Sequence, residues 1–238
     1  MAKLYFRYGA MNSGKSTALL QAAFNYEERG LRILLAKPRL DTKGQSLIVS
    51  RLGVERATDF TIGADEDVYG RFVAERQSAG SPIACLLIDE AQFLSERQVD
   101  DLLRIAVIEN VPVLAYGIRT DFQTIAFPGS RRLLEVAHSI EELKTICRCG
   151  RKAVFNARTI GGKFVFDGDQ VAIDGVDASY ESLCGSCYLE ESHGVLNNRR
   201  REPVRQERGR STDPDAQTAN NPIESAPRSP PACSPSLP

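Results

Sequence analysis

Apolar runs alternate with helix-like segments along the first 140 residues. The runs at 83–88 and 31–36 are almost continuously apolar, which is typical of strands in a parallel sheet that helices cover on both faces. Two further strands are expected at 4–8 and 111–116, with a short strand at 46–50. Beyond this region, short β-like runs are expected at 153–160 and 163–166. The segments with helical spacing or composition lie at 17–24, 65–79, 98–110 and 130–137. This alternation of strand and helix predicts an α/β fold, with a parallel sheet flanked by helices.

A phosphate-binding motif follows the first expected strand. The run Gly9-Ala10-Met11-Asn12-Ser13-Gly14-Lys15-Ser16 fits G-x-x-x-x-G-K-[ST] and lies between a strand and a helix, as the motif requires. Backbone N–H groups of such a loop wrap a polyphosphate, while the lysine reaches the β and γ phosphates and the serine ligates Mg²⁺. The expected phosphate contacts are Gly9, Met11, Asn12, Ser13, Gly14, Lys15 and Ser16. The fold is therefore expected to be phosphate-loop NTPase-like; a strand-to-helix turn without a ligand is the alternative.

An acid pair, Asp89-Glu90, ends the apolar run at 83–88. In a phosphate-loop protein the first acid holds Mg²⁺, and the second is placed to act on the group that attacks the γ-phosphate. Asp89 and Ser16 are therefore the expected magnesium residues. Asp41 lies in a loop on the carboxyl side of a strand, where open α/β sheets bind ligands, so it is a candidate substrate contact or a solvated loop acid.

Four cysteines form a second candidate site. Cys147 and Cys149 are followed, after 34 residues, by Cys184 and Cys187. Four thiolates in two close pairs are the ligands of a closed, structural zinc site. The first pair is C-x-C rather than C-x-x-C, but residues i and i+2 of an extended chain point to the same side. A metal that closes a long loop lowers the entropy cost of ordering it, so the loop is expected to be a lid; a zinc ribbon for macromolecular contact, or plain reduced thiols, are the alternatives.

Composition limits the partners and the location. The net charge is −1, from 30 basic and 31 acidic residues, so no global attraction to nucleic acid or membranes is expected. The longest apolar runs are too short to span a bilayer, and no secretory leader is recognisable, which favours the cytoplasm and reduced thiols. Eight of the twelve prolines lie in 197–238 with few large apolar residues, so this tail is expected to be disordered. The expected parts are a nucleotide-binding domain at 1–140, a zinc-binding domain at 141–196 and the tail.

These motifs together resemble the thymidine kinases of the zinc-containing type that many bacteria and animals share, as opposed to the herpesvirus type. The resemblance rests on the phosphate loop, the stretches 89–93 and 117–122, and the paired cysteines, and it covers about residues 3–192. It implies transfer of the ATP γ-phosphate to the 5′-hydroxyl of thymidine, in pyrimidine nucleotide salvage. It also implies Mg²⁺ with ATP, structural Zn²⁺, a homotetramer and feedback inhibition by thymidine triphosphate.

The resemblance also assigns residues to the nucleoside. It implies that Glu90 is the catalytic base. The nucleoside contacts that it implies are Phe93 and Phe122 as aromatic walls, Tyr180 as a lid contact, and the backbone near Val171, Ile173 and Gly175 for the thymine edge. Departures from the family pattern are Asp174 in place of glycine and Lys43 in place of arginine. Two other classes stay open: an ATPase in which Glu90 activates water, and a nucleotide-dependent switch whose zinc ribbon and arginine-rich tail contact nucleic acid.

Overall fold

A computed structural model describes residues 1–39, 46–170, 178–194 and 196. Several positions named above lie outside these ranges: Asp41, Lys43, Val171, Ile173, Asp174, Gly175 and the tail at 197–238. Within the described ranges no helix combines the length and the apolar character needed to cross a membrane.

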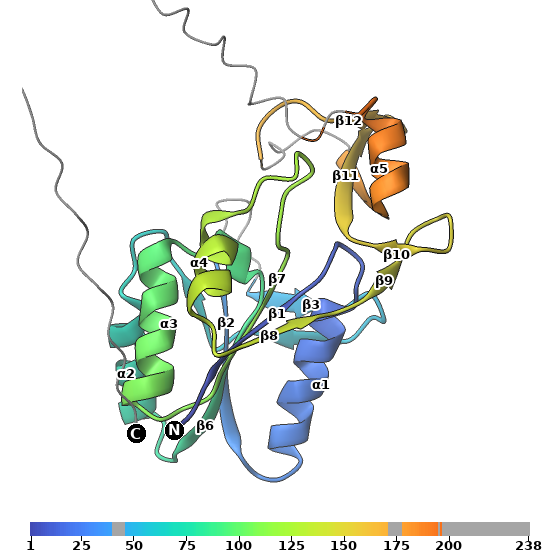
Figure 1. The fold of residues 1–238 in the computed structure, drawn as a ribbon. Coiled ribbons are helices and arrows are strands. Elements are labelled where there is room, and N and C mark those ends of the chain that lie inside the picture. The colour runs from blue at the N-terminus through green and yellow to red at the C-terminus, as the bar shows by residue number, and fades with distance from the viewer. Residues whose placement is uncertain (40–45, 171–177, 195, 197–238) are drawn as a thin grey trace, which may run out of the picture. The chain divides into compact units, whose positions relative to one another are not determined.

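The main sheet has six strands in the order β5-β2-β6-β7-β1-β8, and every pairing is parallel (Figure 1). The strands are β1 (Leu4–Tyr8), β2 (Arg32–Pro38), β5 (Phe60–Ile62), β6 (Ile83–Ile88), β7 (Val113–Gly117) and β8 (Ser139–Glu142). The predicted parallel sheet is therefore confirmed. Parallel order matters for the site because it brings the carboxyl ends of β1, β6 and β7 to one edge.

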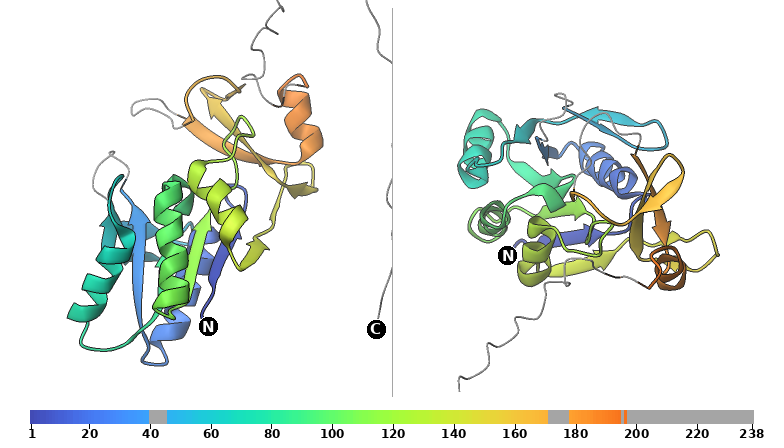
Figure 2. Two further views of the ribbon diagram at one scale, coloured as in Figure 1. Left: turned by 60° about the vertical axis from the view of Figure 1, so that its left-hand side comes forward. Right: turned by 90° about the horizontal axis from the view of Figure 1, so that it is seen from above.

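Helices cover both faces of this sheet, as Figure 2 shows in its left view. α1 (Lys15–Glu27) packs Leu19 and Ala23 into a core on one face. The other face is covered by α2 (Val68–Ser78), α3 (Glu96–Ile108) and α4 (Pro128–Val136), with a short 3₁₀ turn, η1 (Ala91–Phe93). Fully buried side chains of these three helices form that core: Val68, Phe72, Val99, Leu102 and Leu133.

Two helix starts differ from the predicted ones because polar residues cap them. α2 begins at Val68 rather than at 65, since the Asp67 side chain accepts a hydrogen bond from the Gly70 N–H and ends the preceding loop. α3 begins at Glu96 rather than at 98, because Ser95 and Gln98 form a reciprocal capping box. The caps therefore set both boundaries more sharply than hydrophobic periodicity did.

Some strands depend on pairing that is distant in sequence. β5 and β8 extend the sheet at its two edges, and neither was predicted as part of it. The strand expected at 46–50 is observed as β3 (Leu47–Val49), but it pairs with β4 (Glu55–Ala57) in a separate antiparallel hairpin. These short strands have only 3 or 4 residues each, so they carry little periodic signal of their own.

A second, smaller core lies around the cysteines. It contains an antiparallel sheet in the order β12-β11-β13. The elements are β9 (Thr145–Ile146), β10 (Lys152–Ala153), β11 (Phe155–Ile160), β12 (Lys163–Val165), β13 (Ala178–Leu183) and α5 (Gly185–Glu191). Its buried residues are Cys147, Ala153, Ala157, Leu183, Cys184, Cys187 and Tyr188. The strands expected at 153–160 and 163–166 are confirmed within a residue or two, whereas α5 was not predicted.

Candidate active site and metal centre

The phosphate loop leaves the end of β1 and curls into the start of α1. Gly14 (φ 78°) and Asn12 (φ 69°) are left-handed, a conformation that glycine adopts without cost. Gly9 is needed for space: a Cβ there would lie 2.5 Å from the Leu143 carbonyl oxygen. Ser13 Oγ is buried and has no hydrogen-bond partner among the described residues, which suits a loop built to receive ligand oxygens.

Lys15 and Ser16 begin α1, at the positive end of its dipole. The Lys15 ammonium donates to the Ala10 carbonyl at 2.9 Å, so it folds back across the loop. Burial lowers the pKa of Lys15, and the carboxylates of Glu90 and Asp89 oppose that shift. A phosphate group would offer this cation a stronger, charge-assisted partner than a carbonyl does.

The acid pair sits at the end of β6, facing the start of α1. Ser16 Oγ donates to Asp89 Oδ2 at 3.3 Å, so the two predicted magnesium residues are neighbours in space. Asp89 is only 5% exposed, and burial together with the nearby Glu90 raises its pKa to about 7. A carboxylate and a hydroxyl are hard oxygen ligands of the kind Mg²⁺ takes, and a cation would offset the cost of burying the charge. The residues present therefore fit a magnesium ion.

Glu90 is held by a glutamine that sequence reasoning did not single out. Glu90 has φ 52°, a left-handed backbone conformation that is uncommon for residues other than glycine and asparagine. Its carboxylate accepts a hydrogen bond from the Gln92 amide, and Gln92 Oε1 in turn accepts from the Ile118 N–H at 3.2 Å. Gln92 is 1% exposed, so this bridge between the ends of β6 and β7 is shielded from water. The only sequence signal was its place two residues after Glu90.

A cavity of about 600 Å³ opens beside η1. The Phe93 and Phe127 rings lie along it edge to face, with centroids 5.4 Å apart. Gly129 lets α4 approach η1 closely, since a Cβ there would lie 2.5 Å from the Ala91 carbonyl oxygen. Gln170, which lies in the expected lid loop between the cysteine pairs, also lines the cavity. The volume suits a small ligand such as a nucleoside, and Phe127 is a lining residue that sequence reasoning missed.

Phe122 and Tyr180 are not among the residues that line this cavity. Phe122 is 1% exposed and lies under the Arg158 guanidinium, 3.7 Å from the ring centroid. Arg158 is itself 5% exposed and donates to the backbone carbonyls of Asp167 and Asp169, so its guanidinium is largely shielded from solvent. Tyr180 pairs with Arg158 across β11 and β13 and lies on the same face of that sheet.

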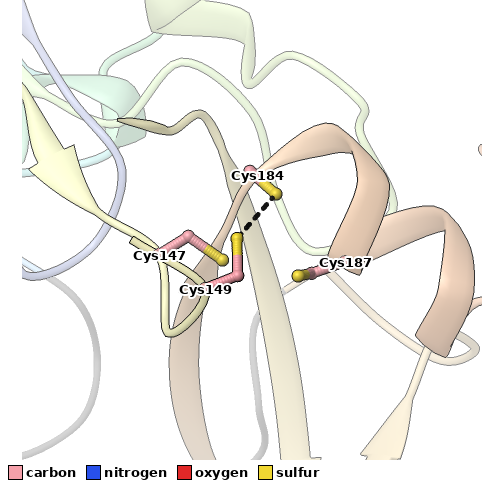
Figure 3. A group of neighbouring side chains, drawn as sticks. All are labelled: Cys147, Cys149, Cys184 and Cys187. Atoms are coloured by element: carbon pink, nitrogen blue, oxygen red, sulfur yellow. Dashed lines mark hydrogen bonds between the residues drawn. The ribbon is translucent and has the colours of Figure 1, made fainter. Parts of the chain in front are cut away.

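The four cysteine sulfurs converge, all within 4.8 Å of one another (Figure 3). Cys147 and Cys149 lie in the turn between β9 and β10, and Cys184 and Cys187 lie at the start of α5. The C-x-C pair works through a tight turn rather than an extended chain: the Gly150 N–H donates to the Cys147 carbonyl at 2.8 Å, and Gly150 has φ 83°. Four thiolates with this convergence fit a tetrahedral zinc ion.

Cys85 is separate from this cluster. It is fully buried in the core beneath α1, and burial raises the pKa of its thiol to about 12. Both observations indicate that Cys85 is a small core residue rather than a nucleophile.

Comparison with known proteins adds the family. The family model described as thymidine kinase matches residues 2–188. The chain belongs to the thymidine kinase family. A thymidine kinase of Rhizobium meliloti (strain 1021) is 46% identical over 186 residues, which cover 77% of this chain and 94% of that protein. A thymidine kinase of Legionella pneumophila (strain Paris) is 47% identical over 196 residues, or 82% of this chain and 91% of that protein.

A third relative, a thymidine kinase of Ruegeria pomeroyi (strain ATCC 700808 / DSM 15171 / DSS-3), is 47% identical over 192 residues, which cover 80% of this chain and 95% of that protein. Membership of the family confirms the resemblance inferred from the motifs, to the bacterial rather than the herpesvirus type. The expected thymidine kinase function and its class, an ATP-dependent phosphotransferase, are confirmed with it.

Proposed function

We propose that this chain transfers the γ-phosphate of ATP to the 5′-hydroxyl of thymidine, with Glu90 as the catalytic base. One observation carries this assignment of roles. Glu90 is linked to two sets of groups: its charge acts on Lys15 and on Asp89, which is bonded to Ser16, and its carboxylate accepts a hydrogen bond from Gln92, which lines the aromatic cavity. A carboxylate at that junction can accept the proton of a hydroxyl that approaches the γ-phosphate.

The phosphate side would position the donor. The N–H groups of residues 9–16 and the Lys15 ammonium would bind the polyphosphate, and Ser16 and Asp89 would hold Mg²⁺, which neutralises charge when bound. Most of the rate acceleration is then positioning and electrostatic stabilisation, since phosphoryl transfer demands little covalent chemistry of the protein. Gln92 keeps the Glu90 carboxylate aimed while the substrates bind.

The cavity side would receive the nucleoside. Phe93 and Phe127 offer apolar ring surfaces against which a pyrimidine base packs well. Other proposed contacts come from the family resemblance: Asp41, Phe122, Val171, Ile173, Gly175 and Tyr180. The position of Phe122 under Arg158 favours an indirect contribution from it, through the shape of the cavity wall.

The remaining proposals come from the sequence, and two of them, the homotetramer and the feedback inhibition, come from the family resemblance alone. They are a structural Zn²⁺ on the four cysteines, a homotetramer, inhibition by thymidine triphosphate and a cytoplasmic location. The division into a nucleotide-binding domain (1–140), a zinc-binding domain (141–196) and a tail (197–238) is proposed with them. The proposed boundary at 140/141 falls inside β8 (Ser139–Glu142), the last strand of the main sheet, so the course of the chain favours a boundary two residues later.

The test is ATP-dependent phosphorylation of thymidine, deoxyuridine, deoxycytidine and deoxyadenosine, with ATP hydrolysis followed in the same reactions. We expect thymidine monophosphate, little product from the purine, and little hydrolysis without an acceptor. ATP turnover that ignores added thymidine would instead show a plain ATPase. Salt-dependent nucleic-acid binding that is lost on deletion of residues 197–238 would favour the switch.

A further inference from the structure

Two side chains of the small antiparallel sheet hold the tip of the phosphate loop. The Met11 N–H donates to Asn156 Oδ1 at 2.7 Å, and the Met11 carbonyl accepts a hydrogen bond from Ser182 Oγ. The backbone N–H and C=O groups of Met11 are therefore both hydrogen-bonded to residues from the cysteine-bearing part of the chain. Neither Asn156 nor Ser182 belongs to the phosphate-loop motif, and neither is a metal ligand candidate.

The two residues are built to act together. Asn156 on β11 and Ser182 on β13 are direct partners in the antiparallel ladder, so their side chains leave the same face of the sheet. Asn156 is 3% exposed and Ser182 is 7% exposed. Hydrogen bonds made at such buried positions do not compete with water, and a broken one leaves an unpaired polar group.

Asn156 is also fixed from its other end. Its Nδ2 donates to the Thr120 carbonyl at 2.9 Å, in the loop that follows β7. The Asn156 amide therefore accepts from the phosphate loop with Oδ1 and donates to the loop after β7 with Nδ2. If the amide were flipped, its NH₂ group would face the Met11 N–H and its oxygen would face the Thr120 carbonyl, so neither hydrogen bond could form. The side chain is thus locked in the orientation that receives the Met11 N–H.

The backbone conformation of the next residue, Asn12, shows why the hydrogen bonds to Met11 affect the shape of the loop. Asn12 has φ 69°, a left-handed conformation that asparagine adopts more readily than most residues but less readily than glycine, so contacts of the neighbouring peptide groups help to hold it. The held peptide group of Met11 directly precedes it. A phosphate loop that already has its binding shape avoids the entropy cost of ordering when the polyphosphate arrives.

We propose that Asn156 and Ser182 are positioning residues for ATP, which hold the Met11 peptide group and so keep the phosphate loop in its binding shape. The proposal rests on the proposed use of ATP by this chain. It makes the cysteine-bearing sheet part of the ATP site, although the expected phosphate contacts lie in the loop that joins β1 to α1.

The experiment uses the full chain with Asn156→Ala, Ser182→Ala and the double variant. Thr159→Ala is the matched control: Thr159 lies on β11 as well, but on the opposite face, and its hydroxyl bonds to Ser179 rather than to the phosphate loop. ATP affinity is measured by calorimetry without nucleoside, and KM for ATP, KM for thymidine and kcat are measured separately. Thermal unfolding is recorded for each variant.

Each single variant should weaken ATP binding about five- to tenfold, as expected for one buried hydrogen bond, with KM for thymidine changed by less than about twofold. The double variant should lose less than the product of the single effects, because both side chains hold one peptide group. Ser182→Thr keeps the hydroxyl and should restore the affinity, and it keeps the test decisive if Asn156→Ala does not fold. Thr159→Ala should behave as the parent chain.

Three results would overturn the proposal. Lower thermal stability with unchanged ATP affinity would make the two residues structural only. A rise in KM for thymidine alone would make them nucleoside contacts. Equal effects of Thr159→Ala would show a general disturbance of the sheet. ATP affinity is measured without any transfer, so failure of this proposal is distinguishable from failure of the parent chain to phosphorylate nucleosides.

Discussion

The two cores of this chain are stabilised in different ways. The main sheet has a large apolar core on each face, with Phe6 and Leu34 in one and Leu35 and Leu87 in the other. The small core has seven buried residues, and three of them are cysteines of the four-sulfur cluster. A core of that size buries too little apolar surface to fold alone, and a metal usually supplies the missing free energy. The main sheet is therefore stabilised by packing, whereas the small core is expected to need the proposed metal.

Loss of one proposed metal ligand should have the largest effect, because it should destabilise the small core and leave the main core folded. Cys184→Ser should reduce bound zinc from about one ion per chain to far less, because a closed site needs all four ligands. Zinc binding contributes about 10 kcal/mol to folding in small zinc domains, so residues 145–191 should exchange amide hydrogens quickly while β1, β6 and β7 stay protected. Metal analysis and hydrogen exchange measure the two effects.

Cys85→Ala is the control for that comparison, since Cys85 belongs to the main core and not to the cluster. It should keep the zinc and cost some general stability through the small cavity it leaves. Full zinc content in Cys184→Ser, or equal exposure of both cores, would remove the distinction between them.

A change of the catalytic base comes next in size and should leave both cores intact. Glu90→Gln keeps the size of the side chain and removes the base, so kcat should fall about 10²–10⁴-fold while ATP affinity and zinc content stay unchanged. Steady-state kinetics and calorimetry measure this. Glu55→Gln, at an exposed position on β4, is the matched control. Retained activity in Glu90→Gln would move the base to another residue.

Asp89 should make the stability of the ligand-free chain depend on pH. Its pKa rises from 3.8 to about 7 through burial and the neighbouring Glu90, so the folded chain binds a proton that the unfolded chain has lost. The stabilisation that this extra proton gives the folded chain is therefore fully present below about pH 4 and is lost as the pH rises through about 7. Asp89→Asn should be similar to the parent near pH 4, gain on it as the pH rises, and be more stable above pH 7 by about 1–3 kcal/mol.

Denaturant unfolding from pH 5 to 8 measures this difference. Saturating Mg²⁺ and ATP should shrink it for the parent chain, since the cation favours the charged carboxylate. A difference between Asp89→Asn and the parent that does not change with pH would show that Asp89 stays ionised in the fold.

Substitution of Gln92, which positions the Glu90 carboxylate, should have the smallest effect. Gln92→Met keeps the bulk but removes the amide, so kcat should fall about tenfold with ATP affinity unchanged. The Ile118 N–H would lose its partner, which costs about 1–3 kcal/mol of stability. In the Glu90→Gln background the same change should have little further effect on kcat. Independent, multiplying effects would mean that Gln92 does not act through Glu90.

Much of the site was predictable because it is local in sequence. Lys15 and Ser16 follow a glycine-rich loop at fixed spacing, and Asp89 and Glu90 end a strand that its apolar run marks clearly. The structure brings Ser16 and Asp89 within hydrogen-bond distance, as the motif implied. The cysteine pairs predicted the metal centre in the same way, because two close pairs of thiols are the usual ligand pattern of a structural zinc site.

The class of fold, the family, the phosphate loop, the acid pair and the four-sulfur cluster all followed from the sequence alone. The contacts that support them became visible only in the folded chain: Gln92 with Ile118, Phe127 with Phe93, and Asn156 with the phosphate loop. The fold also placed Phe122 under Arg158 and added β5 and β8 to the sheet. Motifs and periodicity record contacts between near neighbours in the chain, whereas these contacts join segments that only the packing of the whole fold brings together.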